Sequence, residues 1–387
     1  MRRSIGIARL SVAFSSLLLL SNAAGAQLAV SANDGHTAFV NNTTVGSGNP
    51  VPDTITVLDL SVSPPKVVGE VQAPTSVVGP PQSVAITRDE SIALVTASSK
   101  LDPADPKRLV PDNKVTVIDL KSSPPAVLAT LEAGLGANGM SINRAGTLAL
   151  VANRSEGTVS VFSIAGKTVT PAGKVQLGDA KSGPSHVAFT PDGKRALVTR
   201  DGDHKVSVLS IDGTKVEHAK RDMIAGVRPY SLDVSARGDI AVNGNQGGGM
   251  GDADTISVID LKAEPPRVVN TISVGQSPEG VVLSPDGSYL AVNSINGSHK
   301  PKDSPFFNDF GLLKIYRVNG TELTFVAQAK VGHWGQGIAW SKDNRTLLYQ
   351  ATAEREIQVL SFDGQELKLT GAIKLSAGPV GIRTAGQ

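Results

Sequence analysis

Two side chains of this sequence have the chemistry that acid–base catalysis needs, His186 and Glu279. A histidine titrates near neutral pH, and burial can raise the pKa of a carboxylic acid toward the same range. Such a pair could activate water and protonate a leaving group in a hydrolysis, with Arg228 or Arg383 binding an anion. The same residues could equally be solvated polar groups at the mouth of a water-filled channel, and the sequence leaves both interpretations open.

The segments that resemble the one around Glu279 carry polar or aromatic residues at or near the same place. We predict ligand-binding roles for six of them, Gln82, Asn138, Arg228, Tyr230, Trp334 and Gln336. Amides, a phenol and a guanidinium around one opening suit a small polar ligand. The rings of Tyr230 and Trp334 could stack on such a ligand or could instead be packing residues.

Metal and cofactor sites are not predicted. Asp201 with Asp203, and Asp252 with Asp254, loosely resemble the spacing of calcium ligands, but neither pair has the full set of oxygen ligands. The glycine-rich stretch 247–251 is followed by no helix that could bind a phosphate. The sequence contains no cysteine, which excludes disulfides, thiolate catalysis and cysteine-based metal sites.

One alternating segment, typical of a β-strand, recurs along the chain and must position these residues. Its seven copies span residues 55–60, 115–120, 159–164, 206–211, 256–261, 313–318 and 357–362. β-Branched residues alternate with polar ones in most copies, and successive copies start 44 to 60 residues apart. Units of this length with four strands each predict an all-β, seven-bladed propeller of antiparallel sheets.

The remaining strands of each unit follow the same logic. An inner strand ends in a turn such as Thr190-Pro191-Asp192-Gly193, and a second strand such as 196–199 follows. A ring of sheets must close its free edges. Residues 378–384 match the inner-strand pattern and should pair into blade one, although residues 28–31 compete for that place.

The repeats resemble a known family. Residues 184–198 and 278–293, Ala152-Asn153 and residues 256–261 are similar to the YVTN-type β-propeller repeats of exported proteins, within the superfamily of lactonase-like seven-bladed propellers. The resemblance covers residues 27–387 and implies the propeller fold. It is less specific for activity, because the family mixes uncharacterised exported proteins, surface-layer components and relatives of lactonases. Those relatives imply acid–base residues at the tunnel mouth and no obligatory metal.

Within each blade, strands A to D run outward from the axis, so the B–C loops and the D–A connections share one face. The B–C loops are long in four blades, at residues 42–53, 98–113, 244–254 and 294–310. Long loops on one face of a rigid scaffold usually carry binding, and we expect two walls flanking the tunnel mouth, unless the loops are merely tolerated excursions. Phe306-Phe307 in the longest loop could form a lid or a partner contact, or could tuck beneath the loop.

Residues 1–26 have the features of an export signal. Arg2, Arg3 and Arg9 precede the apolar stretch 10–20, and Ala24-Gly25-Ala26 predicts cleavage after Ala26. Removing these three arginines takes the formal charge from +2 to −1 (2 − 3). We therefore expect a periplasmic or secreted protein with no electrostatic case for nucleic acid, and no membrane attachment once the signal is removed.

Three functions remain open at this point. The first is a binding or interaction module whose B–C face takes a small polar ligand or a protein partner. The second is a lactonase-like hydrolase that uses His186 and Glu279. The third is a propeller subunit of a redox enzyme complex, although no residue pattern marks a quinone or haem site.

Overall fold

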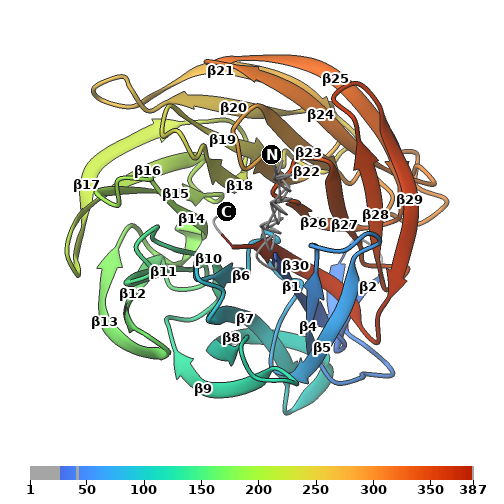
Figure 1. Cartoon of the computed structure of the whole chain (residues 1–387), viewed down its shortest axis with the longest axis horizontal. Helices are drawn as coiled ribbons and strands as arrows, with labels where there is room; N and C mark the ends of the chain where they lie inside the picture. Colours follow the sequence, from blue (N-terminus) through green and yellow to red (C-terminus); the bar gives the residue numbers. More distant parts are fainter. Residues whose placement is uncertain (1–26, 41–42, 386–387) are drawn as a thin grey trace, which may run out of the picture.

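The computed structural model describes residues 27–40 and 43–385, which form a ring of antiparallel sheets (Figure 1). The predicted signal at residues 1–26 lies outside the described residues. Within the described part, seven four-stranded sheets form the blades, and the single helical element is a turn, η1 (Ala180–Ser182). None of the helical structure described there has the length and apolar character needed to cross a membrane.

Each blade consists of four strands that run in order from the axis outward. Blades one to three contain β30 (Gly378–Thr384), β1 (Leu28–Asp34), β4 (Thr54–Asp59) and β5 (Lys66–Gln72); β6 (Val84–Ile86), β7 (Ile92–Asp102), β8 (Asp105–Asp119) and β9 (Ala126–Glu132); and β10 (Ala137–Ile142), β11 (Leu148–Asn153), β12 (Thr158–Ala165) and β13 (Thr168–Gln176). Blades four and five contain β14 (Pro184–Phe189), β15 (Arg195–Arg200), β16 (Lys205–Asp212) and β17 (Lys215–Ile224); and β18 (Pro229–Val234), β19 (Ile240–Asn245), β20 (Asp254–Asp260) and β21 (Arg267–Gly275). Blades six and seven contain β22 (Pro278–Leu283), β23 (Tyr289–Ser294), β24 (Gly311–Asn319) and β25 (Glu322–Val331); and β26 (Gly335–Trp340), β27 (Thr346–Ala351), β28 (Glu356–Phe362) and β29 (Leu367–Lys374).

The hydrophobic core is divided among the blade interfaces. Seven clusters of buried apolar side chains lie among the described residues, one between each pair of neighbouring blades. Strands at the second position, such as β11 and β19, are buried throughout, whereas outer strands such as β5 and β9 are mostly exposed and contain no fully buried residue. This gradient follows from stacking sheets face to face around an axis, since both faces of an inner strand are covered.

Both ends of the described chain meet in blade one. β30 is its innermost strand, as predicted, and pairs with β1, where Ala29 lies opposite Thr384. β1 pairs in turn with β4, where Leu28 lies opposite Asp59. The two candidate segments therefore do not compete, because the C-terminal one takes the first position and the N-terminal one the second.

The long B–C loops gather on one face of the ring. Loop residues of blades one, five and six line a common cavity there, and the loop of blade one carries a small hairpin, β2 (Thr37–Val40) and β3 (Thr43–Gly46). The extra residues of blade two do not fold over the mouth. They lengthen the β7–β8 pairing, and the resulting hairpin packs against β3, so this fourth loop supports the wall instead of lining the cavity.

Candidate functional site

A cavity of about 590 Å³ lies where the inner strands of the propeller begin. Five of the residues predicted from the sequence line it: Arg228, Tyr230, Glu279, Trp334 and Gln336. Gln82 and Asn138 are buried outside its lining, and the Asn138 amide donates a hydrogen bond to the Val78 carbonyl. The lining of the cavity therefore comes mainly from blades one, five, six and seven and their connections, with less contribution from blades two and three.

Glu279 is a buried carboxyl group in the floor of this cavity. It is the second residue of β22, and its side chain accepts a hydrogen bond from the Gln246 amide of the blade-five loop. Burial raises the pKa of Glu279 to about 7, although the Gln246 bond and the charges of Arg228 and Arg154 act to lower it. The carboxyl group is thus close to half ionised at neutral pH, which suits a group that must both take up and return a proton.

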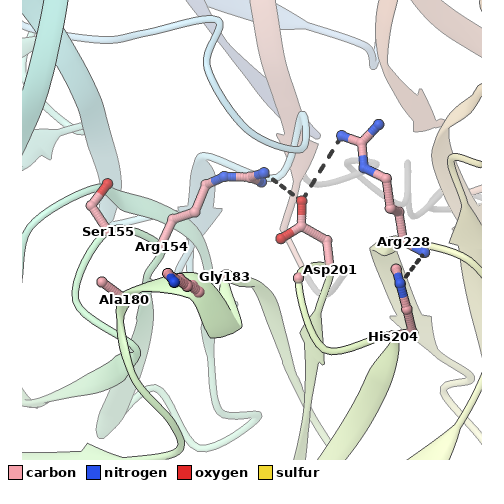
Figure 2. A pocket seen from close by; sticks show the side chains of 9 residues that line it. Arg154, Ser155, Ala180, Gly183, Asp201, His204 and Arg228 are labelled. Atoms are coloured by element: carbon pink, nitrogen blue, oxygen red, sulfur yellow. Dashed lines mark hydrogen bonds and ion pairs between the residues drawn. The ribbon is translucent and has the colours of Figure 1, made fainter. Parts of the chain in front are cut away.

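Two arginines, Arg154 and Arg228, line the cavity and share one aspartate, Asp201; Figure 2 shows the three residues around a neighbouring pocket. The Arg154 guanidinium donates to Asp201 and to the Ser185 hydroxyl, at 3.1 Å. The Arg228 guanidinium lies 4.0 Å from the same Asp201 carboxylate and donates to the Gly247 carbonyl at 3.3 Å. Because one carboxylate is shared between two guanidinium groups, this part of the cavity keeps an excess of positive charge for an anionic ligand.

The same arginines border a second pocket on the outer side. Arg154 and Arg228, with Lys181 and His204, line a hollow of about 500 Å³. His204 helps to position Arg228, since its Nδ1 accepts a hydrogen bond from the Arg228 backbone N–H at 3.1 Å (Figure 2). The two guanidinium groups therefore stand between the mouth cavity and this second pocket.

Arg228 and Trp334 occupy backbone positions that favour glycine. Arg228 lies two residues before Tyr230 and Trp334 two residues before Gln336, and their φ values are left-handed, at 56° and 50°. Gly136 and Gly183 occupy the same place in blades three and four, with φ of 73° and 60°. A large side chain in this conformation is uncommon and costs free energy. Such strain is often found where a side chain is held for function.

Tyr230 supports the site from beneath. Its ring is buried, and the Arg154 guanidinium carbon lies 5.3 Å from the ring centroid. Burial and the charge of Glu279 raise the pKa of Tyr230 above its ordinary value. The phenol therefore stays protonated and able to donate, while one face of its ring is occupied by Arg154 and does not stack on a ligand.

His186 lies deeper than Glu279. It is one residue further along its inner strand, is only 1% exposed, packs beside Gly139 and is not among the residues that line the cavity. Burial and the charge of Arg383 lower the pKa of His186 well below its ordinary value, so the imidazole is neutral. Arg383 also lies inside the ring, 3.9 Å from Asp233. The structure thus places Glu279 with Arg228 and leaves His186 and Arg383 in the tunnel.

Two other acidic residues noted in the sequence, Asp203 and Asp254, have partners within the protein. Asp203 forms an ion pair with Arg200, and Asp254 accepts a hydrogen bond of 2.8 Å from the Ser277 backbone N–H. Phe306 lines the mouth cavity and packs beside Gly251, and Phe307 is half-buried.

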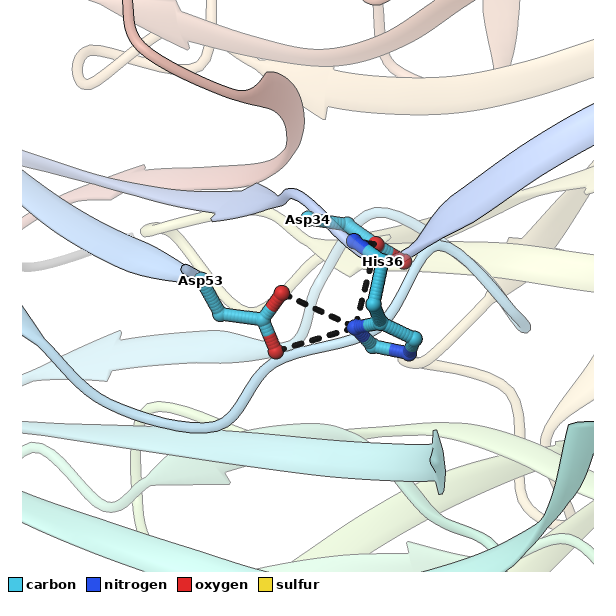
Figure 3. A group of neighbouring side chains, drawn as sticks. All are labelled: Asp34, His36 and Asp53. Carbon is cyan, nitrogen blue, oxygen red and sulfur yellow. Dashed lines mark hydrogen bonds and ion pairs between the residues drawn. The ribbon is translucent and has the colours of Figure 1, made fainter. Parts of the chain in front are cut away.

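Asp34, His36 and Asp53 form a cluster at the two ends of the blade-one loop (Figure 3). The His36 Nδ1 donates to Asp53 at 2.8 Å. The two carboxylates also accept backbone N–H groups, with Asp34 bonded to Val77 at 2.8 Å and Asp53 to Thr75 at 3.1 Å. These bonds tie the blade-one loop to the connection leading into blade two, so the cluster has the chemistry of a structural anchor. The sequence analysis missed it because its members are separated by up to 19 residues.

The sequence analysis also missed Arg154 and Gln246, and it considered Asp201 only together with Asp203 as a loose calcium-ligand pair. Arg154 and Asp201 begin the tight B–C turns of blades three and four, and Gln246 begins the longer loop of blade five. Each of the three directly follows the second strand of its blade. A charged or amide residue at that position could therefore have been predicted to lie at the mouth.

Comparison with known proteins finds a partial match to one family and a match to one fold over most of the chain. The family model described as lactonase, 7-bladed beta-propeller, matches residues 140–299. Antigen Lp49 of Leptospira interrogans is 33% identical over 109 residues, a match that covers 28% of this chain and 23% of that protein. The chain therefore spans less than a quarter of that relative's length.

Solved structures match over nearly the whole chain. A candidate 6-phosphogluconolactonase from Bacteroides fragilis is 16% identical with a TM-score of 0.70, and the match covers 94% of this chain and 99% of that one. A periplasmic gluconolactonase of Pseudomonas aeruginosa is 17% identical with a TM-score of 0.68, covering 93% and 99%. At this identity the likeness establishes the fold alone.

Proposed function

We propose that this chain, a lactonase-like seven-bladed propeller, binds a small anionic lactone at the tunnel mouth and hydrolyses it. The observation that carries the proposal is the buried carboxyl group of Glu279. Its pKa is raised to about 7, and it lies in the same cavity as Arg154 and Arg228. Perturbed carboxyl groups in a cavity with fixed cations are typical of acid–base sites.

The proposed reaction uses Glu279 twice. Ionised Glu279 takes a proton from a water molecule as the water oxygen bonds to the lactone carbonyl carbon. The negative charge that develops on the carbonyl oxygen is stabilised by N–H or O–H donors, for which Arg228 and Tyr230 are placed. The ring C–O bond then breaks, and protonated Glu279 returns its proton to the departing ring oxygen. One water is consumed and the product is a hydroxy acid.

A binding module without chemistry is the second candidate. His186, the other member of the predicted acid–base pair, is absent from the cavity lining, and Gln246 already occupies one Glu279 oxygen. A single carboxyl group beside two arginines would also suit the recognition of a ligand that carries both an anionic group and a hydroxyl.

The cellular location is part of the proposal. We infer export from the arginine-rich, apolar and small-residue pattern of residues 1–26, and the similar Pseudomonas aeruginosa protein is described as periplasmic. Mass spectrometry of the protein recovered from a periplasmic extract should give a chain that begins at Gln27.

The decisive test follows proton release on a panel of neutral and anionic lactones. Removing the general base in Glu279→Gln should lower kcat/KM by about 100-fold or more. The matched control is Glu90→Gln, because Glu90 is also buried but lies in the turn between β6 and β7, on the opposite face. Turnover that survives in Glu279→Gln would refute the mechanism. Saturable binding without turnover, lost in Arg228→Gln, would favour the binding module.

A further inference from the structure

The mouth cavity has two chemically different sides. Opposite the arginines, four half-buried rings line it: Phe39, His299, Phe306 and Trp334. Phe39 comes from the blade-one hairpin, His299 and Phe306 from the blade-six loop, and Trp334 from the connection into blade seven. Three loops far apart in the sequence thus each contribute an aromatic ring to one side of one cavity.

Three of these rings are in mutual contact. The Phe39 ring centroid lies 5.2 Å from that of Trp334 and 5.1 Å from that of His299. These separations are in the range of favourable aromatic pairs. The Trp334 backbone N–H also donates to the Ser298 hydroxyl at 3.0 Å, which fixes Trp334 to the loop that carries His299. We define Phe39, His299 and Trp334 as the aromatic wall.

The wall is uncharged, and one of its ring nitrogens has no hydrogen-bond partner among the described residues. Burial and the charge of Lys300 lower the pKa of His299 to about 4, so its ring is neutral at physiological pH. Its Nδ1 has no hydrogen-bond partner within the described part of the chain. Lys300 also lines the cavity, and its ammonium group donates to the Gly249 carbonyl at 2.8 Å, which joins the loops of blades five and six. The two arginines of the cavity, Arg154 and Arg228, come from other segments than the three that carry these rings.

We propose that the site selects ligands in which a planar, unsaturated or aromatic ring is joined to a carboxylate. The ring lies against the aromatic wall, and the carboxylate meets Arg154 and Arg228. This inference rests on the proposed function for the reaction, and it names the substrate class as carboxylated aryl lactones in preference to simple sugar lactones. A cavity of about 590 Å³ is in the range that holds drug-sized ligands, about 300–1,000 Å³, so a fused or substituted ring fits.

Binding can be measured separately from catalysis. Phenylpropionate, cyclohexanepropionate and gluconate carry the same charge and contain no lactone bond, so their binding does not require turnover. Trp334 supplies a fluorescence signal at the wall. The second tryptophan, Trp340, is fully buried and its indole N–H donates to the Val282 carbonyl at 3.2 Å, so it gives a constant background.

We expect phenylpropionate to bind at least about tenfold more tightly than gluconate, and more tightly than cyclohexanepropionate, because stacking requires a flat ring. Phe39→Leu and Trp334→Leu should each weaken phenylpropionate by about three- to tenfold and leave gluconate unchanged. Calorimetry is used for Trp334→Leu, which lacks the reporter. The control is Phe325→Leu, because Phe325 is 51% exposed and lies on the outer strand β25, away from the cavity.

The outcomes separate the two proposals. Equal affinity for phenylpropionate and gluconate, or equal loss of both in the wall variants, would overturn the proposed ligand class whether or not lactones are hydrolysed. Wall-dependent binding of phenylpropionate would support the class even if no lactone were turned over, in which case the hydrolase proposal alone would fail. Thermal unfolding identifies any variant that has lost its fold, and Phe39→Leu then replaces Trp334→Leu.

Discussion

The Arg154 guanidinium lies across the buried ring of Tyr230, with 5.3 Å between the guanidinium carbon and the ring centroid. The contact joins blade three to blade five at the tunnel mouth and holds a cation beside Glu279. The ring of Tyr230 thus positions Arg154, whereas its hydroxyl is available for the reaction.

These two roles of Tyr230 can be separated by substitution. Tyr230→Phe keeps the ring under Arg154, so KM should stay within about twofold while kcat falls by about tenfold from the loss of one donor. Tyr230→Leu removes the ring as well and should raise KM by about three- to tenfold. Steady-state kinetics on one anionic lactone checks both. Equal KM values for the two variants would contradict a supporting role for the ring.

The pH dependence of hydrolysis should follow the ionisation of Glu279. Since the base must be ionised to accept a proton from water, kcat/KM should rise with pH and level off above about 7, where the carboxyl group has lost its proton. A pH profile of kcat/KM between pH 5 and 9 provides the measurement. A plateau that already begins near pH 5 would show that another group acts as the base.

The fold should be more stable without the Glu279 charge. The pKa of Glu279 rises from 4.5 to about 7 on folding, so between these values the folded protein holds a proton that the unfolded chain has released. Stability therefore falls as pH rises through this window, by about 3 kcal/mol in all. Glu279→Gln should be more stable than wild type at pH 8 by up to that amount and similar at pH 4.5. Denaturant unfolding at both pH values tests this, and an unchanged difference would contradict it.

Substitutions of Arg228 should separate backbone strain from function. Arg228 has a left-handed φ of 56°, which glycine adopts without cost and alanine does not. Arg228→Gly should be more stable than Arg228→Ala by about 1 kcal/mol, while both lose binding of anionic ligands. Thermal unfolding gives the first comparison and calorimetric titration the second. If the alanine variant were the more stable, φ strain would not be the reason.

The anchor of Asp34, His36 and Asp53 should make the mouth sensitive to pH. Burial lowers the pKa of His36, but the Asp53 hydrogen bond and the charges of Asp34 and Asp53 outweigh it and raise the pKa above 6.5. Its stabilising contribution is therefore complete below about pH 6.5 and is lost as pH rises through the higher folded value. His36→Gln should cost about 1–3 kcal/mol at pH 6 and less at pH 9. A cost independent of pH would exclude a charged His36.

The fold could be read from the sequence because its repeats encode it redundantly. Seven copies of one alternating strand, with a turn such as Thr190-Pro191-Asp192-Gly193 before the second strand, predict the number of blades and their order. The closure was only half predicted, since residues 28–31 and 378–384 both fit an inner position. Pairing of β1 with both β30 and β4 resolves it, and this depends on contacts that no local pattern contains.

The site was predicted less completely. Aligning the inner strands shows which residues lie near the mouth, but it does not show which of their side chains line the cavity. Glu279 and His186 differ by one place in the aligned strands, and that single step moves His186 from the mouth into the tunnel. Arg154 was missed because it lies in a tight turn. Only its contact with the ring of Tyr230, two blades away, places it in the site. Loop length identified the face that carries the mouth cavity, but the blade-two hairpin shows that a long loop can pack against a neighbouring loop instead.

The arrangement of blade one also constrains the timing of folding. Its innermost strand, β30, is synthesised after every other strand of the ring, so β1 must wait for the rest of the chain before it has a neighbour on the axis side. Until then the facing surfaces of the first and last blades remain uncovered. Removing only the segment 378–384 should consequently expose two seams at once, leaving an open arc that is prone to self-association.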